Sequence, residues 1–514
     1  MLRLADLVAG LSRSADLGFG LQPGEAVRSS AIALVLGRSL DLPDNDVQAA
    51  MYSALLLHVG CIGYAHETAS LFGDELAWNA AAARTNVADA RDVITTFLPT
   101  FTRGHPPLDR LRLGVTAAIR GRRFGLRYET VACEVGRDVA GRLQLPEEVQ
   151  SSVNHSYERW SGGGVPDGLA AEDIPPGSRL AVLASVAAVF DTIGGADLAA
   201  DAVRQQAGGI LDPHMADHFG QRSRVVLAEV NATDPRDLVL DAEPDPVLSV
   251  PESRLAEVAA AFGDVADVKT PFTYGHARGV AAVAREAGER IGLSAAELAD
   301  LEVAALLHDV GSVAVSNAVW EKPGALSDHE WEQVRLHPYH SERVLAGSAR
   351  LASLAPVVGM HHERLDGSGY HRGCGSADLS MPARVLAAAD AYQAMGQNRP
   401  HRAALVPEQA ERCLVDEARA GRLDVDAVNG VLAAAGHAAV VRREVPAGLS
   451  EREVEVLALV AEGRTNAQIA QRLVISRRTA EHHVQHIYIK IGGSSRAAAA
   501  LFAMQHGLLP RRDQ

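Results

Sequence analysis

Seven side chains that can bind a transition metal lie close together in the sequence, between residues 276 and 390. They form five short clusters: His276, His308-Asp309, His337, His361-His362 and Asp390. Imidazole and carboxylate groups suit iron, manganese and zinc. Seven such ligands exceed the needs of one metal ion, and paired metal ions hydrolyse phosphate esters. The pattern therefore predicts a dinuclear metal centre with phosphohydrolase chemistry.

The elements that must position these ligands are expected to be helices. Residues 276 to 290 and 297 to 307 carry apolar side chains at the 3.6-residue period of an α-helix. Gly311 is suited to end the second helix, which would place His308 and Asp309 in its last turn. Adjacent helical side chains diverge by about 100°. They can still serve two metal ions if Asp309 lies between the ions and His308 binds one of them, so Asp309 is the candidate bridge.

The residues around these ligands resemble the HD-GYP family. The resemblance rests on Leu306-Leu307-His308-Asp309-Val310-Gly311, Lys322-Pro323-Gly324, His337-Pro338, the run from His361 to Tyr370, Asp390, and Asn398-Arg399-Pro400. It covers roughly residues 267 to 435. HD-GYP proteins are all-helical, bind two or three metal ions and typically hydrolyse cyclic di-GMP.

The resemblance implies a role for each ligand. His276, His308 and Asp390 would complete one metal ion, and His337, His361 and His362 the other, with Asp309 as the bridge between two divalent ions, iron or manganese. Lys322 and Arg364 are candidates to hold substrate phosphate, since Arg presents a fork of donors and Lys a mobile charge. The alternative for both is a solvated surface cation.

The chain departs from the family pattern at two positions. Ser312 stands where the family has lysine after His-Asp-x-Gly, and His371 replaces the proline of Gly-Tyr-Pro. Loss of a charge-assisted contact costs about 1.5–3 kcal/mol. Two functions therefore stay open: a metal-dependent phosphodiesterase or phosphohydrolase acting on a cyclic dinucleotide or another phosphate ester, and a non-catalytic metal and ligand sensor.

The chain also contains an internal repeat. A shift of 251 residues aligns residues 24–60 with 275–311 without a gap, and a shift of 205 places 158–164 on 363–369. The metal ligands are replaced in the first copy by Glu25, Leu57-His58, Ser156-Tyr157 and Ser185. Leucine and serine cannot substitute for imidazole or a bridging carboxylate, so the first copy is predicted to be degenerate and to serve packing, dimerisation or sensing.

From Leu449 the sequence closely resembles the helix-turn-helix module of LuxR-type regulators, over nearly every residue from 449 to 509. Ser450 and Ser476 stand at expected N-caps, and Gly463 can end a helix. A small core is expected from Ile469, Leu473, Ile475 and Val484. Residues 449–514 hold 9 Lys+Arg and 6 Asp+Glu, a balance of +3 that suits DNA phosphates.

A recognition helix is predicted from about Arg477 to Ile489. The resemblance implies that Glu481, His482 and Gln485 face the bases, while Thr479 and Lys490 are better placed for phosphate. Arg477 and Arg478 complete the predicted DNA-binding set. The last helix, Arg496 to His506, carries an Ala-rich face with Leu501 and Met504 that is expected to pair with a second copy, giving a homodimer on double-stranded DNA.

Composition limits the class of protein. Aromatic residues make up only 4% of a chain rich in Ala and Leu, which favours an all-α fold. Four cysteines without a CxxC motif indicate a reducing compartment. Neither a signal pattern nor an apolar run of about 18 residues is found, so a cytoplasmic protein without a membrane partner is expected. A formal charge of −15 excludes nucleic-acid binding over the whole surface.

The predicted architecture has two tandem HD-like helical domains and a small helix-turn-helix domain. The boundaries are a degenerate domain 1–232, a linker 233–254, a metal-binding domain 255–436, a linker 437–448 and a DNA-binding domain 449–514. Prolines at 235, 244, 246 and 251 support the first linker, because proline blocks helix continuation. The sequence thus predicts a DNA-binding transcription regulator that carries an HD-GYP-like metal site.

Overall fold

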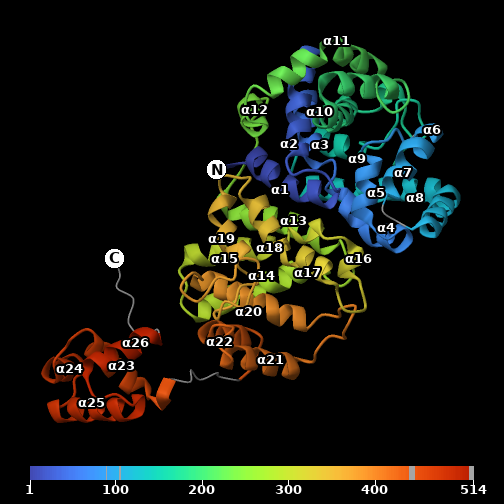
Figure 1. Cartoon of the computed structure of the whole chain (residues 1–514). Helices are drawn as coiled ribbons and strands as arrows, with labels where there is room; N and C mark the ends of the chain where they lie inside the picture. Colours follow the sequence, from blue (N-terminus) through green and yellow to red (C-terminus); the bar gives the residue numbers. More distant parts are fainter. Residues whose placement is uncertain (88, 104–105, 439–445, 507, 509–514) are drawn as a thin grey trace. The chain divides into compact units, whose positions relative to one another are not determined.

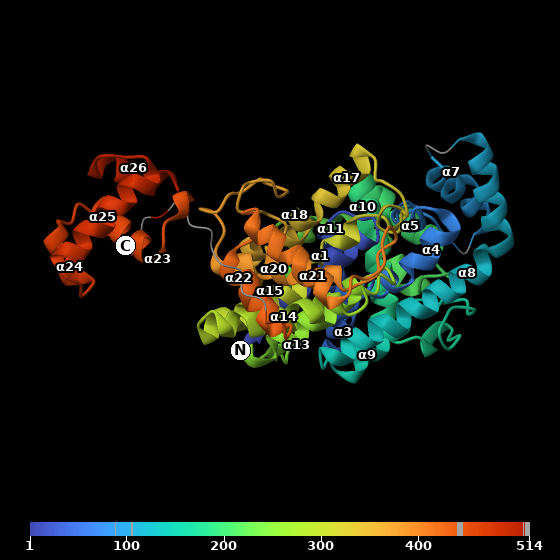
Figure 2. The same cartoon turned by 90° about the horizontal axis from the view of Figure 1, so that it is seen from below.

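The computed structural model describes residues 1–87, 89–103, 106–438, 446–506 and 508 (Figures 1 and 2). The chain divides into two compact units, Met1–Ala439 and Val440–Gln514. The described elements are helices apart from one small antiparallel sheet, in which β1 (Leu2–Arg3) pairs with β2 (Ser249–Val250). The prediction of an all-α protein is confirmed.

The first HD-like copy is built around a bundle of long helices. Its elements are α1 (Leu4–Gly18), α2 (Glu25–Ser39), α3 (Asp44–Leu56), α8 (Pro107–Arg142), α9 (Glu147–Asn154), α10 (Pro176–Gln206), α11 (Pro213–Val230) and α12 (Pro235–Ala242). A set of shorter elements lies between α3 and α8: η1 (Gly60–Tyr64), α4 (Ala65–Phe72), α5 (Glu75–Ala82), α6 (Ala90–Asp92), η2 (Val93–Phe97) and α7 (Leu98–Phe101). A short η3 (Ala171–Asp173) precedes α10.

The second copy holds the predicted metal ligands and is coloured yellow-green to orange in Figure 1. Its helices are η4 (Glu252–Arg254), α13 (Leu255–Asp267), α14 (His276–Arg290), α15 (Ala295–Leu307), η5 (Ser312–Ala314), α16 (Asn317–Trp320), α17 (Asp328–Arg335), α18 (His337–Leu345), η6 (Leu351–Ser353), α19 (Ala355–Gly359), α20 (Met381–Met395), α21 (Pro407–Arg419) and α22 (Val425–Ala434). The helix predicted over 276–290 matches α14, and the one predicted over 297–307 begins two residues earlier, at Ala295.

The two copies of the repeat found in the sequence make equivalent contacts in the structure. Arg179 pairs with Asp212 at 2.7 Å in the first copy, and Arg384 pairs with Asp424 at 2.8 Å in the second. In both glycine loops, an added Cβ would collide with the preceding Glu-Arg backbone, at Gly164 and again at Gly369. These equivalences support an origin by duplication, because composition alone does not reproduce specific ion pairs and close approaches.

The two copies pack against each other within the first unit. Asp6, on α1, accepts hydrogen bonds from Ser348 Oγ at 2.8 Å and from Ala349 N at 3.0 Å in the second copy. At Gly10, one helical turn further, a Cβ would lie 2.8 Å from the Ser348 Cβ. Helix α1 therefore belongs to the core of both copies, which were predicted as separate domains.

The segment 233–254, predicted as a linker, is folded onto the first copy. Pro235 starts helix α12 at the position where proline is tolerated, because its missing N–H would have no partner there. Glu243 then accepts a hydrogen bond from the Tyr52 hydroxyl at 2.8 Å, and β2 pairs with β1. Of the second predicted linker, residues 439–445 lie outside the described residues.

Helix α10 is long and apolar enough to cross a membrane by length and composition, and α3 together with Gly60–Phe72 passes the same test as a bent pair. Core helices of soluble proteins pass this test as well. Leu180, Leu183 and Ala187 of α10 are fully buried inside the first copy, and the helical geometry breaks at Gly194 and Gly195. These features are those of a core helix.

The C-terminal unit contains η7 (Pro446–Gly448), α23 (Glu451–Ala461), α24 (Asn466–Arg472), α25 (Arg477–Ile491) and α26 (Arg496–Gln505). Ser450 and Ser476 accept hydrogen bonds from the Glu453 and Thr479 amides, so both are N-caps as predicted. Gly463 follows α23 with a φ of 82°, the left-handed conformation that ends a helix. Ile469 and Val484 are buried in the core of this unit, with Leu473 and Ile475 packed against it.

Candidate metal centre and DNA-binding module

The seven predicted ligands meet in one place, although they come from five separate elements. His276 and His337 are the first residues of α14 and α18, and Asp390 lies in α20. His308 and Asp309 directly follow α15, while His361 and His362 follow α19. The structure therefore converts five clusters in the sequence into a single buried site.

The ligand atoms fall into the two groups that the resemblance implied. The side chains of His276, His308 and Asp390 offer atoms that all lie within 4.8 Å of one another, and so do those of His337, His361 and His362. A third such group, His308, Asp309 and His361, joins the other two. Among the described residues, every group of three or more side chains able to hold a metal ion belongs to the second copy.

The carboxylate of Asp309 lies between the two groups. Its Oδ1 is 3.2 Å from His337 Nε2 and 3.5 Å from His361 Nε2. Its Oδ2 is 3.5 Å from His308 Nε2 and 3.9 Å from His276 Nε2. Each oxygen thus faces one histidine pair, which is the geometry that a carboxylate shared by two metal ions requires.

The imidazole rings are oriented by hydrogen bonds to their other nitrogen. The Nδ1 atoms of His308, His337 and His361 lie 2.6–2.8 Å from the carbonyl oxygens three residues earlier. An Nδ1–H that donates to a carbonyl leaves Nε2 with a free lone pair, as a metal ligand requires. All three Nε2 atoms face Asp309, so the tautomer and the direction of each ring suit metal binding.

Two ligand atoms are buried without a hydrogen-bond partner, as expected if the site holds a pair of metal ions. His308 Nε2 and Asp309 Oδ1 are buried and have no hydrogen-bond partner. Buried polar atoms are nearly always paired, so each unpaired one calls for an explanation. Metal coordination supplies that explanation, since both atoms point into the cluster of ligands.

Burial and mutual charge set the ionisation of the site. Burial opposes the charged forms of Asp309 and Asp390, but the surrounding imidazoles outweigh it and hold the pKa of both carboxyls well below the ordinary range. Burial lowers the pKa of His308 to about 4. It also opposes protonation of His276 and His361, yet their contacts with Asp390 and Asp309 raise the pKa of both rings. Ionised carboxylates in a buried histidine cluster attract a cation.

Two residues near the ligands were not predicted. Gln397 Oε1 lies 2.9 Å from His276 Nδ1 and therefore orients a ligand that has no carbonyl partner of its own. Arg399, whose guanidinium is largely buried, is within electrostatic reach of Asp390 and Asp309. The sequence held a signal for Arg399 alone, because Asn398-Arg399-Pro400 belongs to the family resemblance and Gln397 precedes that stretch.

The site opens to solvent on one side. The side chains of Asp309 and His362 are each 21% exposed, whereas those of His276, His308, His337 and His361 are 3% exposed or less. Tyr370 borders the open side, with its ring centroid 4.7 Å from that of His362, and Trp331 lies 6.1 Å beyond Tyr370. Trp331 is 40% exposed, so an aromatic edge adjoins the accessible part of the site.

The predicted phosphate-binding cations are differently placed. Lys322 Nζ donates to both carboxylate oxygens of Glu330, at 2.9 and 2.6 Å, so its charge is already paired. Arg364 donates to the Glu363 carbonyl at 3.0 Å and lies within electrostatic reach of Tyr370. Arg364 therefore stays a candidate to hold phosphate, while Lys322 contributes to local structure.

Gly311 does not end a helix in the predicted way. Helix α15 stops at Leu307, with His308 as its C-cap, and Gly311 has a φ of −83°, which any residue can adopt. Its role is close packing: a Cβ would lie 2.2 Å from Ser341 N and 2.4 Å from His337 O. The segment after Asp309 can therefore approach α18, the helix that carries His337, only with glycine at this position.

The corresponding region of the first copy is filled by side chains. Phe19 stacks on His58, with ring centroids 4.1 Å apart, and the Tyr157 hydroxyl lies 3.0 Å from Cys61 Sγ. Burial lowers the pKa of His58 to about 4, so this ring is neutral. The region is a packed aromatic core, in keeping with the predicted loss of the ligands.

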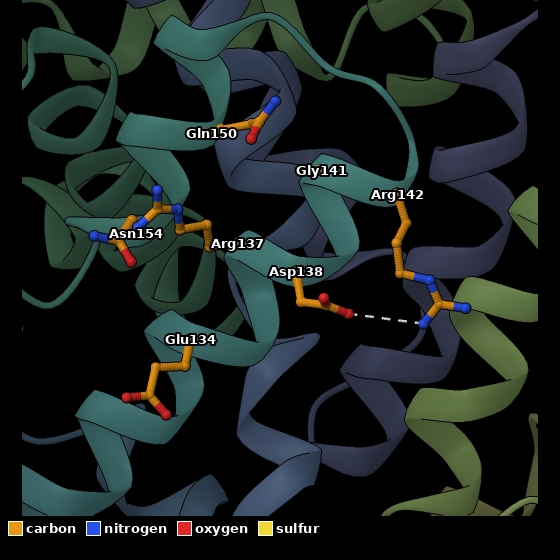
Figure 3. A pocket seen from close by; sticks show the side chains of 7 residues that line it. All are labelled: Glu134, Arg137, Asp138, Gly141, Arg142, Gln150 and Asn154. Atoms are coloured by element: carbon orange, nitrogen blue, oxygen red, sulfur yellow. Dashed lines mark ion pairs between the residues drawn. The ribbon is translucent and has the colours of Figure 1, made fainter.

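A hollow of about 470 Å³ lies on the surface of the first copy between α8 and α9 (Figure 3). It is lined by Glu134, Arg137, Asp138, Gly141, Arg142, Gln150 and Asn154. Its charges are partly paired, since Arg142 contacts both Asp138 and Asp264. The hollow contains none of the metal ligands and is separate from the candidate site.

In the C-terminal unit the predicted base-facing residues share an exposed face. Glu481, His482 and Gln485 are exposed on α25, while Val484 and Ile487 are buried. Arg477, Arg478 and Thr479 are exposed in the first turn of the same helix.

Two sets of residues in this unit make contacts other than the predicted ones. Lys490 Nζ donates to the Glu453 carboxylate at 2.6 Å, so the lysine predicted to bind phosphate holds α25 to α23. In α26, Ala499 and Ala503 are buried in the unit's own core, whereas Leu501 and Met504 are exposed. The Ala-rich face therefore packs internally, and only the Leu501 and Met504 side chains remain for a second copy.

Comparison with known families agrees with both parts of the chain. A profile described as "HD domain" matches residues 132–221 and 261–427, together half of the chain. A profile described as "Bacterial regulatory proteins, luxR family" matches residues 447–503. The HD profile thus matches segments of both copies, including the degenerate one.

Similar proteins include several phosphodiesterases. The chain is 29% identical over 411 residues, 79% of its length, to "3'3'-cGAMP-specific phosphodiesterase 3" of Vibrio cholerae serotype O1, covering 89% of that protein. It is 36% identical over 143 residues to the "Cyclic di-GMP phosphodiesterase response regulator RpfG" of Xanthomonas campestris pv. campestris, covering 27% of this chain and 37% of that protein.

A solved structure shows the same fold. The crystal structure of a cyclic GMP-AMP specific phosphodiesterase of V. cholerae, V-cGAP3, matches 85% of this chain and 98% of its own, with a TM-score of 0.57 and 25% identity. This protein combines the two HD copies and the ligand clusters with a match to the luxR family at residues 447–503. The chain belongs to the HD-domain family, with relatives among the HD-GYP phosphodiesterases, and carries a LuxR-type DNA-binding domain.

Proposed function

We propose that this protein is a transcription regulator whose second HD copy hydrolyses a cyclic dinucleotide at a dinuclear metal centre. The observation that carries the proposal is the position of the Asp309 carboxylate between two groups of histidines. The names of the relatives supply the substrate class, 3'3'-cGAMP or cyclic di-GMP. The LuxR-type module would bind double-stranded DNA, as a homodimer in the cytoplasm.

The ligands divide between two divalent ions, iron or manganese, as their grouping suggests. His276, His308 and Asp390 would hold one ion, His337, His361 and His362 the other, and Asp309 both. When bound, such a pair supplies an activated water and neutralises charge on phosphate oxygens.

Residues around the opening would position the substrate. The phosphodiester would enter where Asp309 and His362 are exposed, because the other ligands are buried. The Arg399 guanidinium is within electrostatic reach of the two carboxylates and would hold a phosphate oxygen with its fork of donors. Tyr370 and Trp331 would stack a nucleobase, an interaction worth about 1–3 kcal/mol per base.

Ser312 favours a second function, that of a sensor without turnover. The family lysine at this position is absent, and Lys322 cannot replace its charge because Glu330 already pairs with it. A site that binds metal and cyclic dinucleotide but lacks this charge would hold the ligand without cleaving it. Occupancy of the site would then control DNA binding.

Turnover separates the two functions. Protein loaded with Mn²⁺ or Fe²⁺ is incubated with 3'3'-cGAMP and with cyclic di-GMP, and linear products are measured by chromatography. We expect linear product from at least one substrate and none from Asp309→Asn, with Asp212→Asn as a control for a buried carboxylate of the first copy. If a dinucleotide binds and changes the affinity for DNA but is not cleaved, the enzymatic proposal is wrong and the sensor function takes its place.

A further inference from the structure

A buried carboxylate of the first copy reaches into the second copy, to chain segments that flank two of the metal ligands. Glu75 is the first residue of α5 and is fully buried. Its Oε1 lies 3.0 Å from Lys269 Nζ and accepts a hydrogen bond from Asn317 N at 2.9 Å, while its Oε2 accepts one from Ser316 Oγ at 2.9 Å. All three donors belong to the second copy.

The donors are themselves joined to one another. Lys269, only 2% exposed, also donates to the Val313 carbonyl at 2.6 Å. The Asn317 side-chain amide donates to the Lys269 carbonyl at 2.7 Å and to Glu321 at 3.1 Å. Glu321 in turn pairs with His66 of the first copy at 2.8 Å. Two side chains of the first copy therefore close this network.

The network joins the two segments that flank the metal ligands. Lys269 lies between α13 and α14, in the loop that leads to His276. Val313, Ser316 and Asn317 lie in the segment that follows Asp309. Glu75 thus links the chain before one ligand to the chain after another.

A buried ion pair is a costly way to stabilise a fold. Desolvation of two charges often cancels their attraction, so apolar side chains of similar size would serve equally well. The pair instead offers directional contacts, since Glu75 fixes a lysine, a serine and a backbone amide at once. Directional contacts define positions, and metal ligands must be held in defined positions.

We propose that Glu75 is a positioning residue for the metal centre, so that the degenerate first copy forms part of the scaffold of the second copy's site. The inference rests on the proposed metal centre. It gives the first copy a role other than packing alone: its own ligands are lost, but it holds the His276 loop and the segment after Asp309 in register.

The test measures metal affinity of the folded full-length protein. Glu75→Gln keeps the shape but removes the charge. Mn²⁺ titration at a temperature well below the melting point should show a higher dissociation constant for the ion held by His276, by up to the 10- to 100-fold that loss of a direct hydrogen-bond partner of a metal ligand causes. Ser316→Ala removes one donor without leaving a buried charge, and should weaken the same ion by a smaller factor.

The control is the ion pair between Arg179 and Asp212, which is largely buried, with side chains 14% and 3% exposed, but lies wholly in the first copy. Arg179→Gln should lower the melting temperature and leave Mn²⁺ affinity unchanged. Wild-type affinity in both Glu75→Gln and Ser316→Ala, or an equal loss in Arg179→Gln, would overturn the inference. If Glu75→Gln does not fold, Ser316→Ala with its control decides the question.

The outcomes also separate this inference from the proposed function. A wild-type protein that binds Mn²⁺ but cleaves no cyclic dinucleotide would overturn the enzymatic proposal alone, because the titration reports metal affinity. A wild-type protein that binds no Mn²⁺ would overturn both.

Discussion

Replacing Gln397 by alanine should weaken the binding of one metal ion and leave the binding of the other unchanged. Gln397 Oε1 lies 2.9 Å from His276 Nδ1, whereas the Nδ1 atoms of His308, His337 and His361 face backbone carbonyls that no substitution removes. Without the amide oxygen, His276 keeps its contacts with Asp390 at 3.1 Å and Asp309 at 3.9 Å, and both use Nε2, the atom needed for the metal. The ring would then be free to adopt the wrong tautomer.

The size of the effect follows from this arrangement. Loss of a partner that orients a metal-bound histidine typically costs 10- to 100-fold in metal affinity, or about 1.4–2.7 kcal/mol. The loss should be confined to the group formed by His276, His308 and Asp390. Gln397→Glu keeps an acceptor in place and should bind at least as tightly as wild type, since a carboxylate raises the basicity of the ring.

Calorimetric titration of metal-free protein with Mn²⁺ measures the effect. We expect two binding events in the wild type and, in Gln397→Ala, one event shifted 10- to 100-fold while the other stays in place. Equal weakening of both events, or none of either, would refute the assignment of Gln397 to one half of the site.

Further predictions concern packing, pH and DNA. Gly311→Ala should cost about 1–3 kcal/mol of stability and weaken Mn²⁺ binding, because its Cβ would lie 2.2 Å from Ser341 N; thermal melting and titration check this against Gly324→Ala, where a Cβ meets no atom within 4 Å. Burial raises the pKa of Asp16 from 3.8 to about 7, so the folded state binds this proton more tightly than the unfolded chain. Stability should therefore fall as pH rises from about 4 to about 7, by at most about 4 kcal/mol, and urea unfolding of Asp16→Asn should lack this component. Gln485→Ala should cost about 1–3 kcal/mol at particular base pairs in a binding-site selection, and retention of the wild-type motif would argue against base contact. Lys490→Met should lower the melting temperature of the C-terminal unit, because it leaves Glu453, whose side chain is only 5% exposed, without its cation; an unchanged melting temperature would leave Lys490 to its predicted role at phosphate.

The features predictable from sequence are those that depend on neighbouring residues. The helix over 276–290 follows from its apolar period, and the N-caps Ser450 and Ser476 follow from local hydrogen-bonding chemistry. The grouping of His276, His308 and Asp390 came from the family resemblance and agrees with the distances between their side chains. Local patterns and a known motif thus account for the fold class and for the clustering of the ligands.

The features that could not be predicted depend on contacts between distant parts of the chain. Glu75 meets Lys269 across 194 positions, and nothing near either residue indicates the pair. The sequence predicts a helix end at Gly311 because glycine often has that role. The structure instead requires glycine there because the backbone of α18 packs against it and leaves no room for a Cβ. The sequence predicts a phosphate contact for Lys490, at the end of the predicted recognition helix, but Glu453 on a different helix pairs with it.

Anomalous diffraction from crystals of the Mn²⁺-loaded protein, recorded above and below the manganese absorption edge, tests the central claim most directly. The account predicts two manganese peaks per chain, one beside His276, His308 and Asp390 and the other beside His337, His361 and His362, with the Asp309 carboxylate between them. A single peak, or two peaks without Asp309 between them, would contradict it.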